Sequence, residues 1–377
     1  MATTKVTTDV IDMSGNTGGL VWAKGTTGDQ PAVGVSTAGD LRENTTTGRT
    51  EVFNGTAWRN LKEAAPTIAV DFLVVAGGGA GAAYGGGGGG AGGLRTSYGT
   101  ASGGGNSNES SLALVAGVQY TITIGAGGVG GAQRAQAPNG GLSSITGTGI
   151  TSITSVGGGG SGIGGGDNGS IAQIGGSGGG GGSATTAGSG SGNGAAGTTN
   201  QGFAGGNSGF LTPNYPSAGG GGAADVGVTP ANSSALGGNG GPGLAVSITG
   251  SSVTYAVGGG GTGSAGGGTG GAGGGNGATF TSLGGTSVVG TPGAANTGDG
   301  AGGGSGIIRS SPTGSTGVSG GSGIVILRCT KATATISAGI TVNGISAAGS
   351  VSGDTTNMPA GEYFYSATLG TGTITFS

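Results

Sequence analysis

The chain carries few side chains capable of acid–base or nucleophilic chemistry, and their spacing does not assemble a catalytic set. It has no histidine, so the serine of the Gly-x-Ser-x-Gly match at residues 175–179 lacks an imidazole base. Over residues 135–308 the only charged residues are three isolated acids, Asp167, Asp225 and Asp299. They do not form the close carboxylate pair that glycoside hydrolysis requires. We therefore expect no enzymatic activity.

Patterns for a metal or an organic cofactor are also missing. The single cysteine, Cys329, permits no intrachain disulfide and no cysteine-based metal site, and we expect it to be a small buried residue. No acid cluster offers Ca²⁺ its oxygen ligands. Gly-x-Gly-x-x-Gly matches are frequent, but no amphipathic helix follows any of them, as a dinucleotide site would require. We expect neither a metal nor a cofactor.

Aromatic side chains give the clearest candidate for a binding site. Over residues 121–254 the only aromatic residues are Phe203, Phe210 and Tyr215, and prolines flank the last of them. A rigid turn that displays rings suits contact with a sugar or an outer-membrane protein, because rings bury area at low entropy cost. We name Phe203, Phe210, Asn214 and Tyr215 as candidate receptor-binding residues. The alternative is that these rings cover the edge of a glycine-rich stack.

The high glycine content limits which kinds of structure could hold these residues in place. It supplies 107 of 377 residues, and each loses more backbone entropy on folding than any other residue type. Such a chain folds only if closely packed backbones return that cost. Charged residues make up 7% of the chain and the net charge is −3, so nucleic acid and anionic membranes are poor partners. No apolar run approaches the ~20 residues of a membrane span and no secretory signal is visible, so we expect synthesis in a cytoplasm.

Apolar segments that we expect to be strands lie before, between and after the glycine runs. Strands that end in a run are expected at 68–75, 118–124, 150–156 and 253–257, and a closing strand at 324–328. Burial on both faces is expected for the first. Collagen is excluded because glycine keeps no third-position register, and a flexible linker would contain no such strands. We expect packed polyglycine-II-type helices, whose outward N–H and C=O groups bond to neighbouring helices across glycines.

The two ends of the chain differ in composition from its middle. Residues 1–65 hold most of the charges and both tryptophans, and residues 39–58 predict three short strands with turns at Gly48 and Gly55. So small a module cannot hold a large core, so we expect it to pack against a partner or a copy of itself. Residues 330–377 predict a small β-domain that ends in a hairpin turned at Gly370.

Two parts of the sequence resemble bacteriophage fibre proteins. Residues 20–25, 39–42 and 53–58 are similar to a module common near the start of phage tail-fibre and virion-appendage proteins. Residues 71–81 and 89–96, closed by 321–328, resemble the glycine-rich domain of phage fibre and adhesin proteins. The resemblance implies stacked polyglycine-II helices with loops at one end that contact the bacterial surface. It also implies attachment to the particle by the N-terminal region, for which Trp22 and Trp58 are the candidate residues.

The expected protein is all-β plus irregular structure, without significant α-helix. It would comprise a virion-attachment β-module (1–65), a glycine-rich domain (66–329) and a C-terminal β-domain (330–377). The expected function is a virion appendage that binds a bacterial glycan or outer-membrane protein without catalysis. Its partners would be other virion proteins and copies of itself, with a trimer favoured. The alternatives are a structural fibre or head decoration protein without receptor binding, and a polyglycine-II ice-binding protein, against which the lack of a regular threonine array argues.

Overall fold

The computed structural model describes most of the chain, namely residues 23–30, 36–61, 65–131, 135–164, 171–183, 192–208, 214–231, 234–279, 288–304 and 316–377. These residues form β-strands, two 3-10 turns and long glycine-rich segments, with no α-helix among them. The all-β expectation is therefore confirmed over this part of the chain. No described helix is long and apolar enough to span a membrane. The chain divides into two compact units, Met1–Ala65 and Pro66–Ser377.

The first unit is a four-stranded sheet. Its strands, in order across the sheet, are β1 (Ala23–Gly25), β2 (Leu41–Asn44), β3 (Arg49–Phe53) and β4 (Trp58–Asn60). β1 runs parallel to β2, and the other pairs are antiparallel. The two hairpin turns contain Gly48 (φ 66°) and Gly55 (φ 98°), in the left-handed region that favours glycine. The three predicted strands and both predicted turns are thus confirmed. A 3-10 turn, η1 (Thr27–Asp29), follows β1.

The second unit is built on an antiparallel sheet that nearly closes into a barrel. Its path is β10 (Ile153–Ser155), β9 (Ser143–Gly147), β8 (Gln119–Thr123), β17 (Tyr363–Phe376), β13 (Ile324–Cys329), β5 (Thr67–Val75) and β6 (Leu94–Thr96). β10, at one end of this path, comes back close to β5 and β6 at the other end. The hydroxyl of Ser155 on β10 donates to the carbonyl of Val74 on β5 at 2.8 Å. Six strands and a turn complete the described part of the unit: β7 (Leu112–Val115), β11 (Leu244–Val246), β12 (Val253–Tyr255), β14 (Thr333–Ile336), β15 (Ile340–Val342), β16 (Gly349–Ser352) and η2 (Gly103–Gly105).

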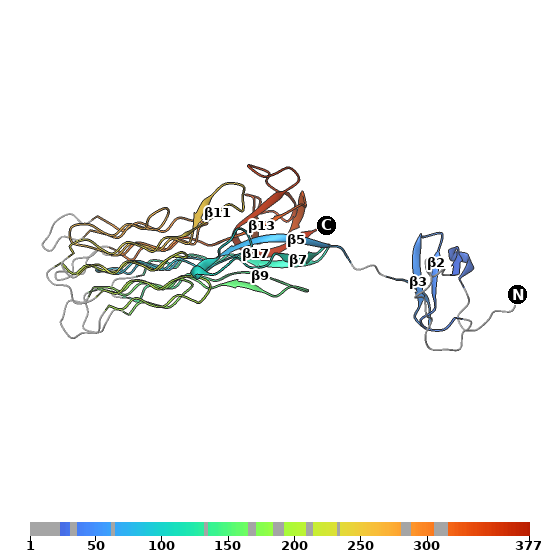
Figure 1. Ribbon diagram of the computed structural model, residues 1–377, viewed down its shortest axis with the longest axis horizontal. Helices are drawn as coiled ribbons and strands as arrows, with labels where there is room; N and C mark the ends of the chain where they lie inside the picture. The colour runs from blue at the N-terminus through green and yellow to red at the C-terminus, as the bar shows by residue number, and fades with distance from the viewer. Residues whose placement is uncertain are drawn as a thin grey trace. The chain divides into compact units, whose positions relative to one another are not determined.

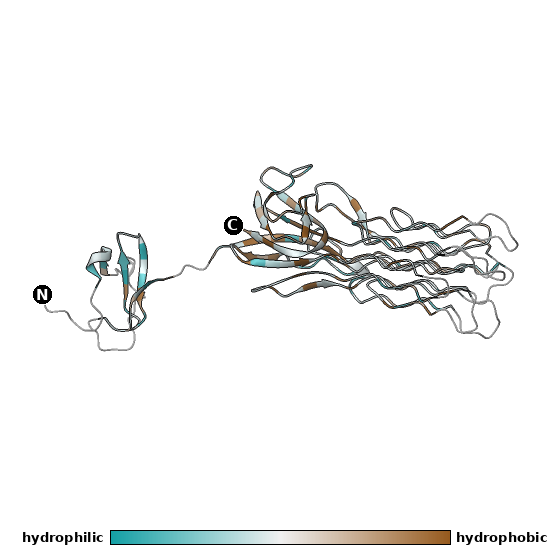
Figure 2. Ribbon diagram, turned by 180° about the vertical axis from the view of Figure 1, so that it is seen from behind, coloured by the Kyte–Doolittle hydropathy of each residue, from teal (hydrophilic) through white to brown (hydrophobic). Residues whose placement is uncertain are grey.

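The strands that open and close the glycine-rich region are direct neighbours. β5 and β13 pair antiparallel, with Leu73 opposite Ile326. On β5, Val70, Phe72 and Val74 belong to one buried apolar cluster, whereas Leu73 and Val75 belong to another. The strand is therefore buried on both faces, as its apolar sequence predicted. Apolar residues gather on these strands, and the long segments beyond them are paler (Figure 2).

The C-terminal residues complete this barrel and do not form a separate domain. β17 is one strand of 14 residues, so the predicted final hairpin is wrong. Gly370 lies inside it at φ 84°, where the strand changes partners: Tyr363–Ala367 pair with β13, and Thr371–Thr375 pair with β8. The expected β-domain at 330–377 therefore belongs to the second compact unit. A glycine between two apolar runs is compatible with a turn, but Gly370 lies within a continuous strand because both flanking runs pair with neighbouring strands.

The glycine-rich segments run side by side away from the barrel (Figure 1). In residues 86–93, amides three residues apart bond to the same neighbour. Gly87, Gly90 and Gly93 donate to the carbonyls of Gly162, Gly159 and Val156. Gly88 and Ala91 donate to Ala218 and Gly221, and Gly89 and Gly92 donate to Ala301 and Gly298. The direction of hydrogen bonding thus repeats every three residues.

Backbone packs directly against backbone in this bundle. Backbone hydrogen bonds join residues 86–93 to six surrounding segments, at 76–83, 156–163, 177–183, 216–222, 256–261 and 298–304. A Cβ atom on Gly88 would lie 1.9 Å from the carbonyl oxygen of Gly259, and one on Gly300 would lie 2.0 Å from that of Gly89. No side chain fits there. Glycine is therefore needed for its missing side chain at these positions.

Polar side chains replace backbone partners at the surface of the bundle. Asn139 Oδ1 accepts from the amide of Gly160 at 2.8 Å, and its Nδ2 donates to the carbonyl of Ile174 at 3.1 Å. Three residues earlier, Gln136 donates to the carbonyl of Ile171 at 3.1 Å. Side-chain oxygens accept from backbone amides in the same way at four other places: Asn207 accepts from Gly194, Asn239 from Thr269, Thr291 from Asn276 and Ser319 from Gly130. Outer segments thus satisfy their outward amides without a further neighbour.

Candidate functional site

Two of the predicted site residues, Trp22 and Phe210, lie outside the described residues. The structure separates two of the others, Phe203 and Tyr215. Residues 202–208 and 216–222 pair antiparallel: the amide of Phe203 donates to Gly222, and that of Gly206 to Gly219. Phe203 therefore lies at the base of this hairpin, and Tyr215 lies beside the connection between its arms.

The base of that hairpin is close to the barrel. The ring of Phe203 lies next to Gly105 of η2, since a Cβ atom there would come within 3.2 Å of the ring. Phe203 is half-buried in this position. Its place fits the alternative in which the ring covers an edge of the stack. Asn214 and Tyr215 are also half-buried, and Tyr215 has a left-handed backbone with φ 45°. Of the described candidate residues, Phe203 is therefore the one placed near the barrel.

Three residues of the second unit that the sequence analysis considered for chemistry, Ser177, Cys329 and Asp299, are all buried. Ser177 is fully buried and its hydroxyl has no hydrogen-bond partner, so no substrate can reach it. Burial raises the pKa of Cys329, which keeps the thiol protonated, and its side chain is buried as predicted. Asp299 is also fully buried, and burial raises its pKa to about 6 against hydrogen bonds from Thr297 and Val257. Among the described residues no group of three or more acids, cysteines or histidines could hold a metal.

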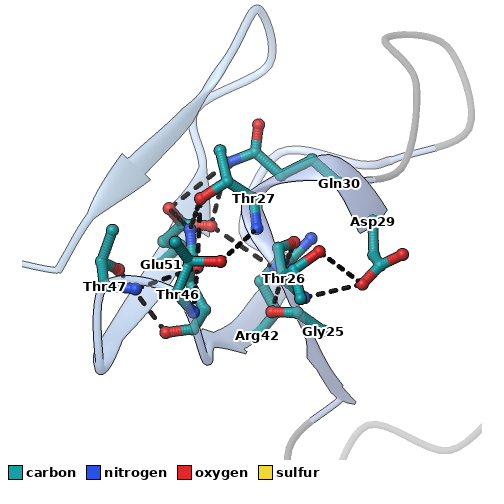
Figure 3. A network of polar contacts seen from close by, with 10 residues as sticks. Gly25, Thr26, Thr27, Asp29, Gln30, Arg42, Thr46, Thr47 and Glu51 are labelled. Carbon is teal, nitrogen blue, oxygen red and sulfur yellow. Dashed lines mark hydrogen bonds and ion pairs between the residues drawn. The ribbon is translucent and has the colours of Figure 1, made fainter.

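The first unit contains a polar network that sequence reasoning did not identify. Arg42 on β2 is 3% exposed, and its Nη2 donates to the carbonyls of Gly25 and Thr26 at 2.7 Å each. Its Nε lies 3.5 Å from the carboxylate of Glu51 and makes no hydrogen bond. Glu51 in turn accepts from Asn44 at 2.8 Å. Figure 3 shows how these groups connect β2 and β3 to the loop around η1.

A cavity of about 310 Å³ adjoins this network. Its lining includes Lys24, Asp29, Asp40, Arg42 and the predicted site residue Trp58. The guanidinium of Arg42 stacks 5.7 Å from the centre of the Trp58 ring. The centre of the Phe53 ring lies 5.5 Å from that of Trp58. Short strands and the η1 turn bring these residues together from three parts of the sequence. The signal that could have revealed them is the concentration of charges around a tryptophan in a short module.

The carboxylates of the cavity are held by local hydrogen bonds. Asp29 Oδ2 accepts from the hydroxyl and the amide of Thr26, both at 2.7 Å, and these bonds lower its pKa. Asp40 Oδ2 accepts from the amide of Thr37 at 2.7 Å. Lys24 pairs with Glu43 at 2.9 Å, and both side chains are exposed. The site therefore presents charged side chains of both signs, and both of its carboxylates are held by local hydrogen bonds.

Comparison with known proteins places the longer unit in a family. No curated protein and no solved structure matches the chain. The model of one family, described as the glycine-rich domain, matches residues 64–330. That range begins just before β5 and ends just after β13, so the family boundaries coincide with the paired strands that open and close the bundle. Because the match covers more than half of the sequence, the chain belongs to the glycine-rich domain family.

Proposed function

We propose that the glycine-rich segments are polyglycine-II-type helices in close packing. The three-residue repeat of hydrogen-bond direction supports this, because such a helix has three residues per turn and makes no internal hydrogen bonds. The bonds from residues 86–93 to surrounding segments also fit, since each turn points its amides in three directions. Circular dichroism should give a polyproline-II-like spectrum with some sheet. A random-coil spectrum with fast amide exchange across residues 86–93 and 256–261 would contradict the packing.

We further propose that the protein is a non-catalytic binding appendage of a phage particle. The observation that carries this is the arrangement of the bundle. Residues 76–83 leave β5 and residues 86–93 return to β6, so the turn at Tyr84 lies at the end away from the barrel. A bundle held by backbone bonds gives its far end a fixed framework on which connections can vary. The resemblance to phage fibre proteins supplies the particle and the bacterial surface as partners.

Each end of the chain has its own part in this proposal. The N-terminal region, with Trp22 and Trp58, attaches to the virion, and the far end of the bundle meets a glycan or outer-membrane protein. Several copies on one particle would raise avidity even if each contact were weak. A trimer would supply such copies. Light scattering on the full chain tests this, and one chain mass in solution would contradict self-association.

Binding to cells separates this function from its alternative. Labelled full-length protein should adsorb to the host bacterium and compete with the phage for infection. Tyr215→Ala should weaken adsorption, whereas Phe203→Ala should not, because Phe203 packs near the barrel. The two variants are matched, since each removes one half-buried ring. If the pure protein neither adsorbs nor competes, the purely structural fibre or head decoration protein becomes the better explanation.

A further inference from the structure

Asparagine precedes glycine at several positions of the chain, among them 54, 139, 239, 276 and 343. At such a pair the chain can react with itself, because the backbone nitrogen of the glycine can attack the side-chain carbonyl carbon of the asparagine. Glycine permits this close approach since it has no Cβ atom. The fold decides which pairs react, because an amide held in a hydrogen bond has to open before it can attack.

In the bundle, the attacking amide is already engaged at three of these pairs. Asn139, Asn239 and Asn276 are all exposed, so water reaches their side chains. Each side-chain oxygen nevertheless accepts a backbone amide of a neighbouring segment, at 2.8 to 3.0 Å. Each following glycine amide donates at 2.9 Å, in the pairs Gly140 to Gly158, Gly240 to Thr269 and Gly277 to Gly268.

The pair Asn54–Gly55 has the same two residues in a different setting. It lies in the exposed hairpin turn between β3 and β4, where Gly55 has φ 98°. Neither the amide of Gly55 nor Nδ2 of Asn54 donates to a described residue. By contrast, Asn54 Oδ1 accepts from the amide and the hydroxyl of Thr56 at 3.0 and 2.9 Å, and from the amide of Ala57 at 2.9 Å. Three donors thus surround the oxygen, while the nucleophile and the leaving group are free.

We propose that Asn54 is a site of spontaneous succinimide formation, promoted by its own turn. Hydroxide removes the proton of the Gly55 amide, and the nitrogen attacks Cγ of Asn54. The bond from Cγ to Nδ2 breaks, and Nδ2 takes a proton from water and leaves as ammonia. Negative charge develops on Oδ1 during the attack, where the donors from Thr56 and Ala57 stabilise it. Water then opens the ring at either carbonyl carbon, which gives aspartate or isoaspartate and adds one negative charge to the first unit.

Asn343 separates the effect of these donors from that of a free glycine amide. The amide of Gly344 also donates to no described residue, but Asn343 is half-buried and its side chain is anchored. Its Nδ2 donates to the carbonyls of Ser352 at 3.0 Å and Phe364 at 3.3 Å, and its Oδ1 accepts a single bond, from Ser366 at 2.8 Å. A leaving group held by two bonds and an oxygen with one donor make this pair slow to react.

This proposal does not rest on the virion role, and the full chain tests it. The protein is incubated at pH 8.5 and 37 °C and digested with pepsin in acid, which stops the attack, and tandem mass spectrometry gives the conversion of each asparagine. In the folded protein Asn54 should convert at least tenfold faster than Asn139, Asn239, Asn276 and Asn343. In urea the five rates should agree within about threefold, because the dipeptide is the same at each position.

Variants of Thr56 test the part that the turn plays. Thr56→Val removes the hydroxyl donor to Oδ1 and should slow the conversion of Asn54 at least threefold, whereas Thr56→Ser should keep the wild-type rate. Circular dichroism checks that both variants keep the sheet. An unchanged or faster rate in folded Thr56→Val would overturn the role of the turn, and so would conversion of Asn343 as fast as that of Asn54. Equal rates at Asn54 and Asn139 in the folded protein would overturn the proposal as a whole.

Discussion

The hydroxyl of Thr297 lies within hydrogen-bond distance of Asp299 and of a backbone carbonyl, and both bonds can form only if the Asp299 carboxyl group is protonated. Thr297 Oγ1 lies 2.6 Å from Asp299 Oδ2 and 2.8 Å from the carbonyl oxygen of Ala294. A hydroxyl has one hydrogen, so it cannot donate to both oxygens. A protonated Asp299 resolves this, because it donates to Thr297, which then donates to Ala294. Asp299 is fully buried and forms no ion pair with a described residue, which favours the same state.

The first prediction is that Asp299→Asn stabilises the protein at neutral pH. Asparagine keeps an oxygen for the amide of Val257 and can donate to Thr297 without carrying charge. Burial raises the pKa of Asp299 to about 6 from 3.8, so the folded state binds more protons between these values. Its contribution to the free energy of unfolding therefore falls as pH rises from about 4 to about 6, and stays low above that.

Denaturant unfolding at pH 4 and pH 7.5 checks this prediction. The variant should gain about 1–3 kcal/mol over wild type at pH 7.5, and much less at pH 4. An equal loss of stability at both pH values would mean that the carboxylate is stabilising in its ionised form. Thr297→Val is the companion variant, since it removes the hydroxyl and leaves Asp299 in place.

The second prediction concerns the glycines of the bundle. Gly88→Ala should lower the free energy of unfolding by roughly 3 kcal/mol or more, because the new methyl group would overlap the carbonyl of Gly259 and backbone cannot move aside cheaply. Gly131→Ala is the matched control. Among the described residues, its Cβ atom would meet nothing closer than 3.8 Å, so its effect should be within about 0.5 kcal/mol. Equal effects at the two positions would show that glycine is not required by packing.

The third prediction concerns the surface of the bundle. Asn139→Ala should cost about 1–2 kcal/mol, since it leaves the amide of Gly160 without its acceptor and removes a bond to Ile174. Asn139→Asp keeps the acceptor and loses only the donor, so it should recover part of the loss. Hydrogen exchange at the Gly160 amide provides a local readout. That exchange should accelerate in the alanine variant and remain slow in the aspartate variant.

Much of the strand framework follows from the sequence. The turns at Gly48 and Gly55 and the two-sided burial of β5 come from local residue patterns, so they were predictable. The course of β17 was not, because a glycine at position 370 fits a turn as well as a bend. Which one forms depends on pairing with β8 and β13, which are distant in sequence. The near-closed barrel was missed for the same reason.

The candidate site was predictable only in part. Trp58 was identified, but Arg42 and Asp29 reach it through the parallel pairing of β1 with β2, which no local pattern indicates. The aromatic residues at 203 and 215 are close in sequence, yet the hairpin between them separates the two rings along its length. One available signal was overlooked. The spacing of Gln136 and Asn139, and of Ile171 and Ile174, repeats the three-residue period of the bundle on its exposed surface.

The fourth prediction concerns Arg328, which joins separate segments beside the barrel. Its Nε donates to Glu362 at 2.6 Å, its Nη1 donates to the hydroxyl of Tyr98 at 2.8 Å, and its guanidinium stacks 4.6 Å from the centre of that ring. It also reaches the carbonyl of Ile248 at 3.3 Å. Arg328→Lys should therefore cost about 2 kcal/mol, because an ammonium cannot reproduce the planar fork and Arg328 is buried.

A double-mutant cycle with Tyr98→Phe tests whether this cost comes from the stacked, hydrogen-bonded pair. Tyr98→Phe alone should cost about 1 kcal/mol, since it removes one hydrogen bond and keeps the ring. If the two residues act together, the losses measured by denaturant unfolding should fall short of additivity by about 0.5 kcal/mol or more. Glu362→Gln should cost less than Arg328→Lys, because the Glu362 side chain is 37% exposed and water replaces part of the ion pair. Additive losses would instead assign the cost of Arg328→Lys to Glu362 and Ile248.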